Sequence, residues 1–172
     1  MCIMKYGFDP IANPDAKILI LGTLPSQESL RTGQYYANHR NAFWTIMEHL
    51  LGVQTDNDYE KRKSMLLNAS IAVWDVAHQA ERHGSLDANI NSNSVIPNEF
   101  NDFLAQHHNI ETICFNGKKA ELLFRKDVFN SLAVDYQQST FLILPSTSPA
   151  LAALTLSEKI ERWRIVTALL AV

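Results

Sequence analysis

The segment Ile18–Trp44, ILILGTLPSQESLRTGQYYANHRNAFW, decides how the rest of this 172-residue chain is interpreted. It begins with a continuous apolar run that stops at Gly22, which is typical of a parallel strand buried on both faces. Few core-type side chains follow until a helical pattern starts at Asn41. A compact domain seldom keeps so long a connection without using it. The connection leaves the carboxyl end of the predicted strand, where open α/β sheets bind their ligands.

The composition is that of an ordinary globular protein, with 47% hydrophobic and 19% charged residues. The chain shows no apolar run of membrane-spanning length and no signal peptide, so we expect no membrane association. Cys2 and Cys114 show neither metal-ligand spacing nor a disulfide framework, which favours a reducing, cytoplasmic location. A net charge of −3 argues against a protein that coats nucleic acid electrostatically, but it permits local contact with a few phosphates.

Four apolar segments alternate with helical patterns along the chain. The strands are expected at residues 17–21, 71–74, 111–115 and 140–144. The helices are expected from Asn41, over residues 58–67, from Pro97, over residues 118–124 and from a capping box at Thr155 and Glu158. Residues 1–16 and 78–96 are expected to be irregular. This order predicts one domain, residues 1–172, of the α/β class: a three-layer α/β/α sandwich around a four-stranded, mostly parallel sheet.

All four predicted strands end in polar loops, which should meet at one sheet edge and form one composite pocket. In the first loop, Tyr36, Asn41 and Phe43 could stack on a nucleobase and read its edge. The alternative is that Phe43 and Trp44 anchor a helix in the core, that the tyrosines pack the loop, and that Asn41 is an N-cap. His39 could act as an acid or base near neutral pH, or be a solvated histidine.

Further polar residues follow the other strands. Asp75 could orient a water or stabilise a cationic intermediate, or it could be an N-cap or an ion-pair partner. The segment Leu144–Ala150 places three hydroxyls between two prolines, which suits a phosphate contact or a self-capped turn. Ser26 and Ser29 suggest a serine nucleophile only weakly, because no GxSxG pattern is present. No Cys/His set has the spacing of a metal site, so no metal is expected.

Five segments, LILGTLPS, QYYANHRNAFW, IAVWDV, NGKKA and LPSTSPA, together resemble the uracil-DNA glycosylase superfamily. The similarity is greatest to its hypoxanthine-DNA (DNA-deoxyinosine) glycosylase group, and it extends from about Phe8 to the last helix. The resemblance implies a monofunctional DNA glycosylase of base excision repair that uses no cofactor. Such an enzyme flips a deaminated base out of DNA and hydrolyses its N-glycosidic bond. Hypoxanthine is the expected base, with uracil and xanthine as alternatives, and DNA containing that base is the expected partner of a monomeric protein.

The residues and the resemblance together give a set of predicted roles. Catalytic roles are predicted for Asn41 and Asp75. Base-binding roles are predicted for Gly22, Thr23, Leu24, Tyr36, Phe43 and Asn116, with Phe43 as the surface on which the base stacks. DNA-binding roles are predicted for Ser26, Arg40, Lys118, Pro145, Ser146, Thr147, Ser148 and Pro149.

The chain departs from the family pattern at two places. Leu24 stands where the mismatch-uracil branch has an asparagine in its GINPG-type motif, which argues against the uracil activity of that branch. Asn38 and His39 stand where the familiar YYGHPRN loop has histidine and proline. Other functions therefore stay open: a non-catalytic member that binds nucleic acid, a uracil- or mismatch-specific glycosylase, or a hydrolase of small nucleosides or esters that uses Ser26 or Ser29.

Overall fold

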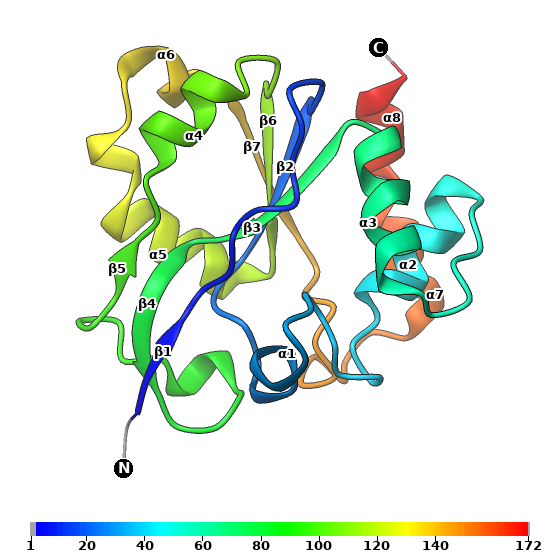
Figure 1. The fold of residues 1–172 in the computed structure, drawn as a ribbon, viewed down its shortest axis with the longest axis horizontal. Coiled ribbons are helices and arrows are strands. Elements are labelled where there is room, and N and C mark those ends of the chain that lie inside the picture. Colours follow the sequence, from blue (N-terminus) through cyan, green and yellow to red (C-terminus); the bar gives the residue numbers. More distant parts are fainter. Residues whose placement is uncertain (1–2, 172) are drawn as a thin grey trace.

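The computed structural model describes residues 3–171, and Figure 1 shows the order of its elements. The strands are β1 (Ile3–Tyr6), β2 (Ile18–Gly22), β3 (Ile71–Asp75), β4 (Ala77–Arg82), β5 (Ile96–Pro97), β6 (Thr112–Asn116) and β7 (Thr140–Leu144). The helices are α1 (Gln27–Thr32), α2 (Phe43–Leu51), α3 (Tyr59–Asn68), α4 (Phe100–Gln106), α5 (Lys118–Asp127), α6 (Val134–Gln137), α7 (Leu156–Trp163) and α8 (Ile165–Leu170). Short 3-10 helices form η1 (Asp87–Asn89) and η2 (Phe129–Ser131).

The central sheet has the strand order β3-β2-β6-β7, and all of its neighbouring strands are parallel. Strands β2, β3 and β6 are buried along their whole length, as expected for continuous apolar runs. The register pairs Gly22 with Asp75 and Asn116 with Leu144, which are the last residues of the four strands. The four carboxyl ends therefore meet at one edge, as the sequence predicted.

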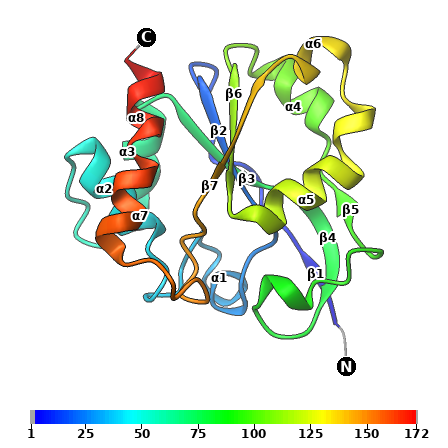
Figure 2. The same cartoon turned by 180° about the vertical axis from the view of Figure 1, so that it is seen from behind.

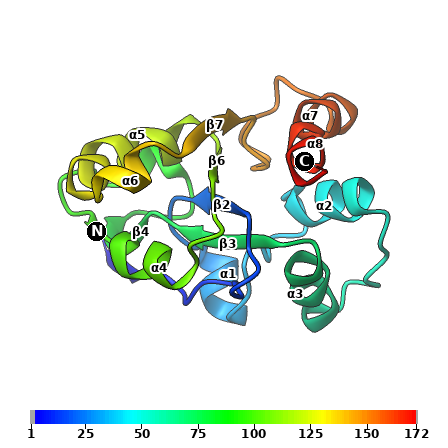
Figure 3. The same cartoon turned by 90° about the horizontal axis from the view of Figure 1, so that it is seen from above.

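Helices cover both faces of this sheet. Figure 3 shows α4, α5 and α6 on one face and α2, α3, α7 and α8 on the other, and Figure 2 shows the same layers from behind. Fully buried aromatic rings fill the layers: Phe43 and Trp163 meet edge to face at 6.0 Å on one face, and Phe115 and Phe124 lie 5.2 Å apart on the other. The predicted three-layer α/β/α sandwich is confirmed.

A second, antiparallel sheet with the order β1-β4-β5 was not predicted. The expectation of irregular structure over residues 1–16 and 78–96 was wrong, because β1 lies in the first range and β4 in the second. Both strands are rich in polar or exposed side chains, so no apolar run marks them. Pro97 belongs to β5 and does not open a helix, since α4 begins at Phe100.

The long connection after β2 is partly helical, because α1 occupies its first half. Ser26 caps α1 by accepting a hydrogen bond from the N–H of Ser29. Helix α2 starts at Phe43 with Ala42 as the N-cap residue, although the Asn41 side chain still accepts the Phe43 N–H at 3.0 Å. Sequence periodicity could not reveal α1, because a helix of six residues is too short to give a helical pattern.

The carboxyl-terminal helix is divided into α7 and α8 at Arg164. The predicted capping box is confirmed, because the Thr155 and Glu158 side chains each accept a hydrogen bond from the other residue's backbone N–H. Leu156, the first residue of α7, is 44% exposed.

Within residues 3–171, no helix has the length and apolar character needed to cross a bilayer. Cys114 is a free, buried thiol in β6. Cys2 lies outside the described residues.

A buried guanidinium joins the small sheet to the loop that follows β2. Arg82, the last residue of β4, is 1% exposed. It donates hydrogen bonds to the carbonyls of Leu24 and Gly84, both at 3.1 Å, and to the carbonyl of Pro25. Buried carbonyls need such partners. Arg82 therefore holds the loop after β2 next to the turn after β4.

We expect Arg82→Leu to lower the free energy of unfolding by roughly 3–5 kcal/mol, because it leaves buried carbonyls without donors. Arg82→Lys should lose less, since an ammonium can still satisfy part of the set. Urea unfolding of both variants measures the effect, with the exposed Arg164→Ala as the control that should match the unmodified protein. An Arg82→Leu protein of unchanged stability would show that these hydrogen bonds contribute nothing to the free energy of unfolding.

Candidate active site

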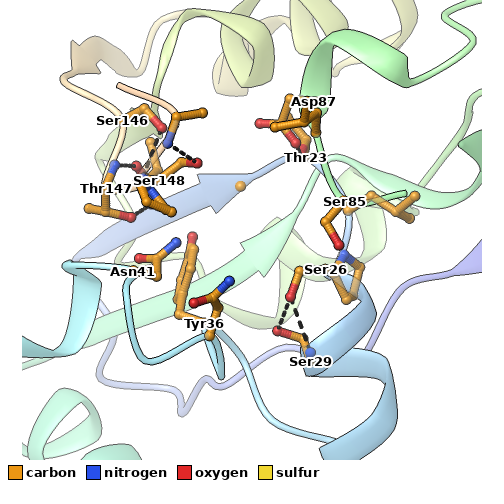
Figure 4. Close-up of a pocket in the computed structure, with 18 of the residues that line it drawn as sticks. Thr23, Ser26, Ser29, Tyr36, Asn41, Ser85, Asp87, Ser146, Thr147 and Ser148 are labelled. Carbon is orange, nitrogen blue, oxygen red and sulfur yellow. Dashed lines mark hydrogen bonds between the residues drawn. The ribbon is translucent and has the colours of Figure 1, made fainter. Parts of the chain in front are cut away.

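A cavity of about 370 Å³ lies at the carboxyl edge of the four-stranded sheet. Each strand end contributes to it: Gly22 from β2, Asp75 from β3, Asn116 from β6 and Ser146 after β7. Figure 4 shows polar side chains around the opening, with the serine-rich segment on one side and Thr23 with Asp87 across from it. The volume is typical of a site for a small ligand. The composite pocket expected from the four polar strand ends is confirmed.

The structure brings most of the predicted residues to this cavity. Those that line it are Gly22, Thr23, Leu24, Ser26, Tyr36, Arg40, Asn41, Asp75, Asn116, Ser146, Thr147, Ser148 and Pro149. Pro145 and the exposed Lys118 instead border a neighbouring groove beside β7. His39 is exposed and is not among the residues that line the cavity.

Phe43 does not offer a stacking surface to a ligand. Its side chain is fully buried, and Tyr36 covers it, with the two rings stacked at 4.0 Å and 25°. Helix α2 turns Phe43 into the core, where it also meets Trp163. The structure therefore does not present Phe43 as a base-stacking surface, contrary to the prediction, and the aromatic residues that line the cavity are Tyr35 and Tyr36. Trp44 is likewise a core residue, as the alternative interpretation held.

Gly22 is required by a close approach at the cavity floor. A Cβ added to Gly22 would lie 2.5 Å from Asp75 Oδ1 and 3.0 Å from the Tyr36 hydroxyl. Any other residue would therefore displace one of these two groups. Tyr36 itself has φ +52°, a left-handed conformation that costs a bulky residue about 1 kcal/mol or more. Packing against Phe43 holds the ring in place despite this strain.

Among residues 3–171, two buried polar atoms at this floor have no hydrogen-bond partner of standard geometry. They are Asp75 Oδ2 and the Tyr36 hydroxyl oxygen. A buried polar atom left unpaired costs about 1–3 kcal/mol, and such atoms at a cavity are candidates for contact with a ligand. Asp75 and Tyr36 therefore mark where polar ligand atoms would bind.

The pKa of Asp75 is unusually high for a carboxyl group. Burial, and next the charge of Asp87, raise the pKa of Asp75 to about 7, although Arg82 acts in the opposite direction. Burial also raises the pKa of Asp87, which nevertheless accepts a 2.7 Å hydrogen bond from Thr23 Oγ1. Burial and the charge of Asp75 raise the pKa of Tyr36, and the nearby side chain of Asn116 acts in the opposite direction. Near neutral pH, Asp75 thus exists partly as the neutral acid.

Sequence reasoning missed one wall of the cavity. Ser85, Leu86 and Asp87 line it, and all three lie between β4 and β5 in the range expected to be irregular. The only local signal was a charged residue in a polar loop. The wall depends on Arg82, which ties this turn to the loop after β2, and such a long-range bond leaves no periodic pattern.

Thr147 holds two loops at the cavity together. Its hydroxyl accepts a hydrogen bond from Asn116 Nδ2 and its N–H donates to Asn116 Oδ1, both at 2.9 Å. Its carbonyl accepts the Ala42 N–H at 3.0 Å. Thr147 is 1% exposed, so its hydroxyl is engaged inside the protein and is not presented to DNA as predicted. Asn116, predicted to bind the base, is in turn engaged with Thr147.

Two side chains of helix α7 donate hydrogen bonds to the serine-rich segment, residues 145–149. Lys159 is 5% exposed and donates to the Ser148 carbonyl at 3.2 Å, and the Trp163 indole donates to the Pro145 carbonyl at 2.9 Å. The Ser146 hydroxyl accepts the Ser148 N–H at 3.2 Å. This part of the segment is therefore a self-capped turn whose hydroxyls also border the cavity.

The loop before α2 is a closed turn. Asn38 Oδ1 accepts the Arg40 N–H at 2.9 Å, and the Asn38 carbonyl accepts the Asn41 N–H at 2.8 Å. Such an Asx turn restricts the backbone where the family pattern has proline. It places the Asn41 side chain beside Tyr36 at the cavity wall (Figure 4).

No group of three histidine, cysteine, aspartate or glutamate side chains that could hold a metal ion occurs in the part of the chain that the structure describes.

The fold and the cavity define an α/β protein with a ligand site at the carboxyl edge of a parallel sheet. The family model of the Uracil DNA glycosylase superfamily matches residues 10–169. The chain therefore belongs to the uracil DNA glycosylase superfamily, as its sequence motifs suggested.

Similar proteins come from two Methanosarcina species. A hypoxanthine DNA glycosylase of Methanosarcina acetivorans is 39% identical over 119 residues, which are 69% of this chain and 74% of the relative. A hypoxanthine DNA glycosylase of Methanosarcina barkeri is 33% identical over 117 residues, 67% of this chain and 73% of the relative.

A solved structure is also similar. It is a solution NMR structure from Methanosarcina acetivorans of a protein proposed to be a uracil DNA glycosylase. The two folds agree with a TM-score of 0.74 at 32% identity, over 96% of this chain and 99% of that chain.

We expect Asn116→Ala to speed amide hydrogen exchange at Thr147, because the variant removes the acceptor of that N–H. The free energy of unfolding should fall by about 1–3 kcal/mol, the usual cost of breaking a buried hydrogen-bonded pair. Residue-resolved exchange by NMR measures the first effect and urea unfolding the second. Asn109→Ala, which removes an exposed side-chain bond, is the control. Unchanged exchange at Thr147 would show that the Asn116 side chain does not protect the Thr147 N–H.

The stability of the protein should fall as pH rises through the range in which Asp75 titrates. Native Asp75 keeps its proton up to about pH 7, whereas a free carboxyl loses it near 3.8, so unfolding releases a proton between these values. Asp75→Asn cannot titrate. The free energy of unfolding of Asp75→Asn minus that of the unmodified protein should therefore rise by roughly 2–4 kcal/mol from pH 4 to pH 7 and level off above. A difference independent of pH would show that the Asp75 pKa is not raised.

Proposed function

We propose that this protein is a DNA glycosylase that removes hypoxanthine from DNA. The observation that carries the proposal is the cavity floor at the sheet edge, where Asp75 and Tyr36 present unpartnered polar atoms. Membership of the superfamily and the names of the two Methanosarcina relatives support the reaction class and the base.

The reaction begins when the deaminated nucleotide rotates out of the duplex and its base enters the cavity. The opening is bordered by Arg40 and by the hydroxyls of Ser146 and Ser148, which suit contact with the phosphates and sugars beside that nucleotide. Cleavage of the N-glycosidic bond leaves positive charge on the sugar, and water then adds to C1′. We assign to Asn41 the amide that orients this water, since its side chain lies at the cavity wall.

Leu24 supports hypoxanthine over uracil as the preferred base. Leu24 borders the cavity where the mismatch-uracil branch has an asparagine. The site therefore lacks that amide beside Gly22, and Asn41 supplies an amide from the loop before α2. The expected setting is the cytoplasm, and the expected working form is a monomer that contains every group of the cavity within one chain.

The test is a glycosylase assay on duplex oligonucleotides that carry one deoxyinosine, deoxyuridine, deoxyxanthosine or mismatched thymine. We expect release of free hypoxanthine under single-turnover conditions and an alkali-labile abasic site in the same strand. Tight binding of inosine DNA without release would instead identify a non-catalytic member of the family. Hydrolysis of free inosine but not of DNA would identify a nucleoside hydrolase.

Asn41→Asp and Asn41→Ala separate the two functions of this side chain. Asp keeps an acceptor for the Phe43 N–H at the start of α2, but it removes the amide donor. Both variants should lower the single-turnover rate by roughly 100-fold or more, while DNA affinity changes little. Only Asn41→Ala should also lose stability. Asn109→Ala should keep the full rate, and full rates in both Asn41 variants would remove Asn41 from the mechanism.

A further inference from the structure

We propose that Asp75 donates a proton to a ring nitrogen of the departing base, and that Asp87 is the positioning residue that keeps this proton on Asp75. The inference rests on the proposed function and deepens it, because it names purines with a basic ring nitrogen as the substrate class of this cavity.

Asp75 is placed to touch the base. It is the last residue of β3, it is 4% exposed, and it lines the cavity floor. Its Oδ1 lies against Gly22, while Oδ2 has no partner among the residues that the structure describes. The Tyr36 hydroxyl oxygen, which also has no partner of standard geometry, lies near the same space that a Gly22 side chain would occupy. A ligand in the cavity therefore meets one carboxyl and one hydroxyl side by side.

The ionisable groups around Asp75 come from several elements. Asp87 belongs to η1, Arg82 ends β4, and Tyr35 and Tyr36 lie in the loop before α2. Lys119 of α5 acts on Asp87. Asp87 and burial favour the neutral form of Asp75, and Arg82 favours the charged form. The guanidinium of Arg82 is engaged with three backbone carbonyls, which limits how far it can neutralise the two carboxyls.

Thr23 fixes Asp87 in this arrangement. Its hydroxyl donates to Asp87 Oδ1 at 2.7 Å, and this bond favours the charged form of Asp87. Two buried carboxyls close to one positive charge cannot both ionise without cost. The bond from Thr23 favours the charged form of Asp87, and the charge of Asp87 in turn favours the protonated form of Asp75. Asp87 thus acts through Asp75 and need not touch the base.

The proton transfer makes a purine a better leaving group. Hypoxanthine has two unsubstituted basic ring nitrogens, N3 and N7, whereas uracil has none. Asp75 gives its carboxyl proton to one of these nitrogens while the C1′–N9 bond breaks and its electron pair moves to the base. The base leaves neutral, and water adds its oxygen to C1′ and loses a proton to solvent. Solvent then returns a proton to Asp75, so the net reaction consumes one water.

The experiment measures single-turnover release of hypoxanthine from inosine duplex DNA between pH 5 and pH 9. We expect the rate of the unmodified protein to fall above about pH 7, where Asp75 loses its proton. In Asp87→Asn the fall should start at lower pH, because the charge that keeps Asp75 protonated is gone. Asp75→Asn, which has nearly the same shape, should lose roughly 100-fold or more at pH 6 and show no such fall.

Asp127→Asn is the matched control. Asp127 in α5 also has a buried carboxylate oxygen without a partner, but it lies outside the cavity. This variant should keep the rate and the pH profile of the unmodified protein. Titration of ¹³C-labelled aspartate by NMR gives a second measurement that needs no activity. One carboxyl should titrate near pH 7, vanish in Asp75→Asn and titrate at lower pH in Asp87→Asn.

The outcomes separate the two proposals. A flat pH profile with a full rate in Asp75→Asn would overturn the proton donor and leave the DNA glycosylase standing. An Asp87→Asn profile identical to that of the unmodified protein would overturn the role of Asp87, as would an unshifted Asp75 titration. If no variant released any deaminated base at any pH, the glycosylase itself would be overturned, and the proton donor with it.

Discussion

The carboxyl of Asp75 lies against the Cα of Gly22, across the last paired position of β2 and β3, and the cavity is arranged around this contact. A side chain at position 22 would occupy the space that Asp75 and the Tyr36 hydroxyl share. The glycine therefore leaves room for two buried polar groups at the cavity floor. The backbone of Tyr36 is left-handed where its hydroxyl reaches this space. Backbone strain of this kind persists only where the surrounding packing determines it.

Two buried hydrogen-bonding centres keep that arrangement rigid. Arg82 ties the loop after β2 to the turn after β4, and Thr147 ties the end of β6 to the loop before α2. Irregular segments at a cavity have many backbone groups that helices and strands do not satisfy. By satisfying them internally, Arg82 and Thr147 leave the cavity largely preformed, so little binding energy is needed to order it.

The electrostatics of the site suit an acidic protein that acts on a polyanion. The net charge is −3, so long-range attraction to DNA is weak, and contact depends on local groups such as Arg40. A second negative charge at the cavity floor would repel the phosphates beside the flipped nucleotide. Burial that keeps Asp75 partly neutral removes this repulsion, and nearby phosphates would raise its pKa further.

The sequence by itself determined the central sheet and its outer layers. Continuous apolar runs mark β2, β3 and β6 because parallel strands covered on both faces must be apolar throughout, and the residues that end these strands, Gly22, Asp75 and Asn116, locate the cavity edge. An apolar run also marks β7, although this edge strand is partly exposed. Motifs on those ends also identified the family. Only the tertiary structure decided what lies within the cavity. Phe43 turned into the core, Asn116 and Thr147 engaged each other, and the wall at Asp87 came from a segment without apolar periodicity. These outcomes depend on side-chain direction and on bonds between residues far apart in the chain, and local patterns carry no information about either.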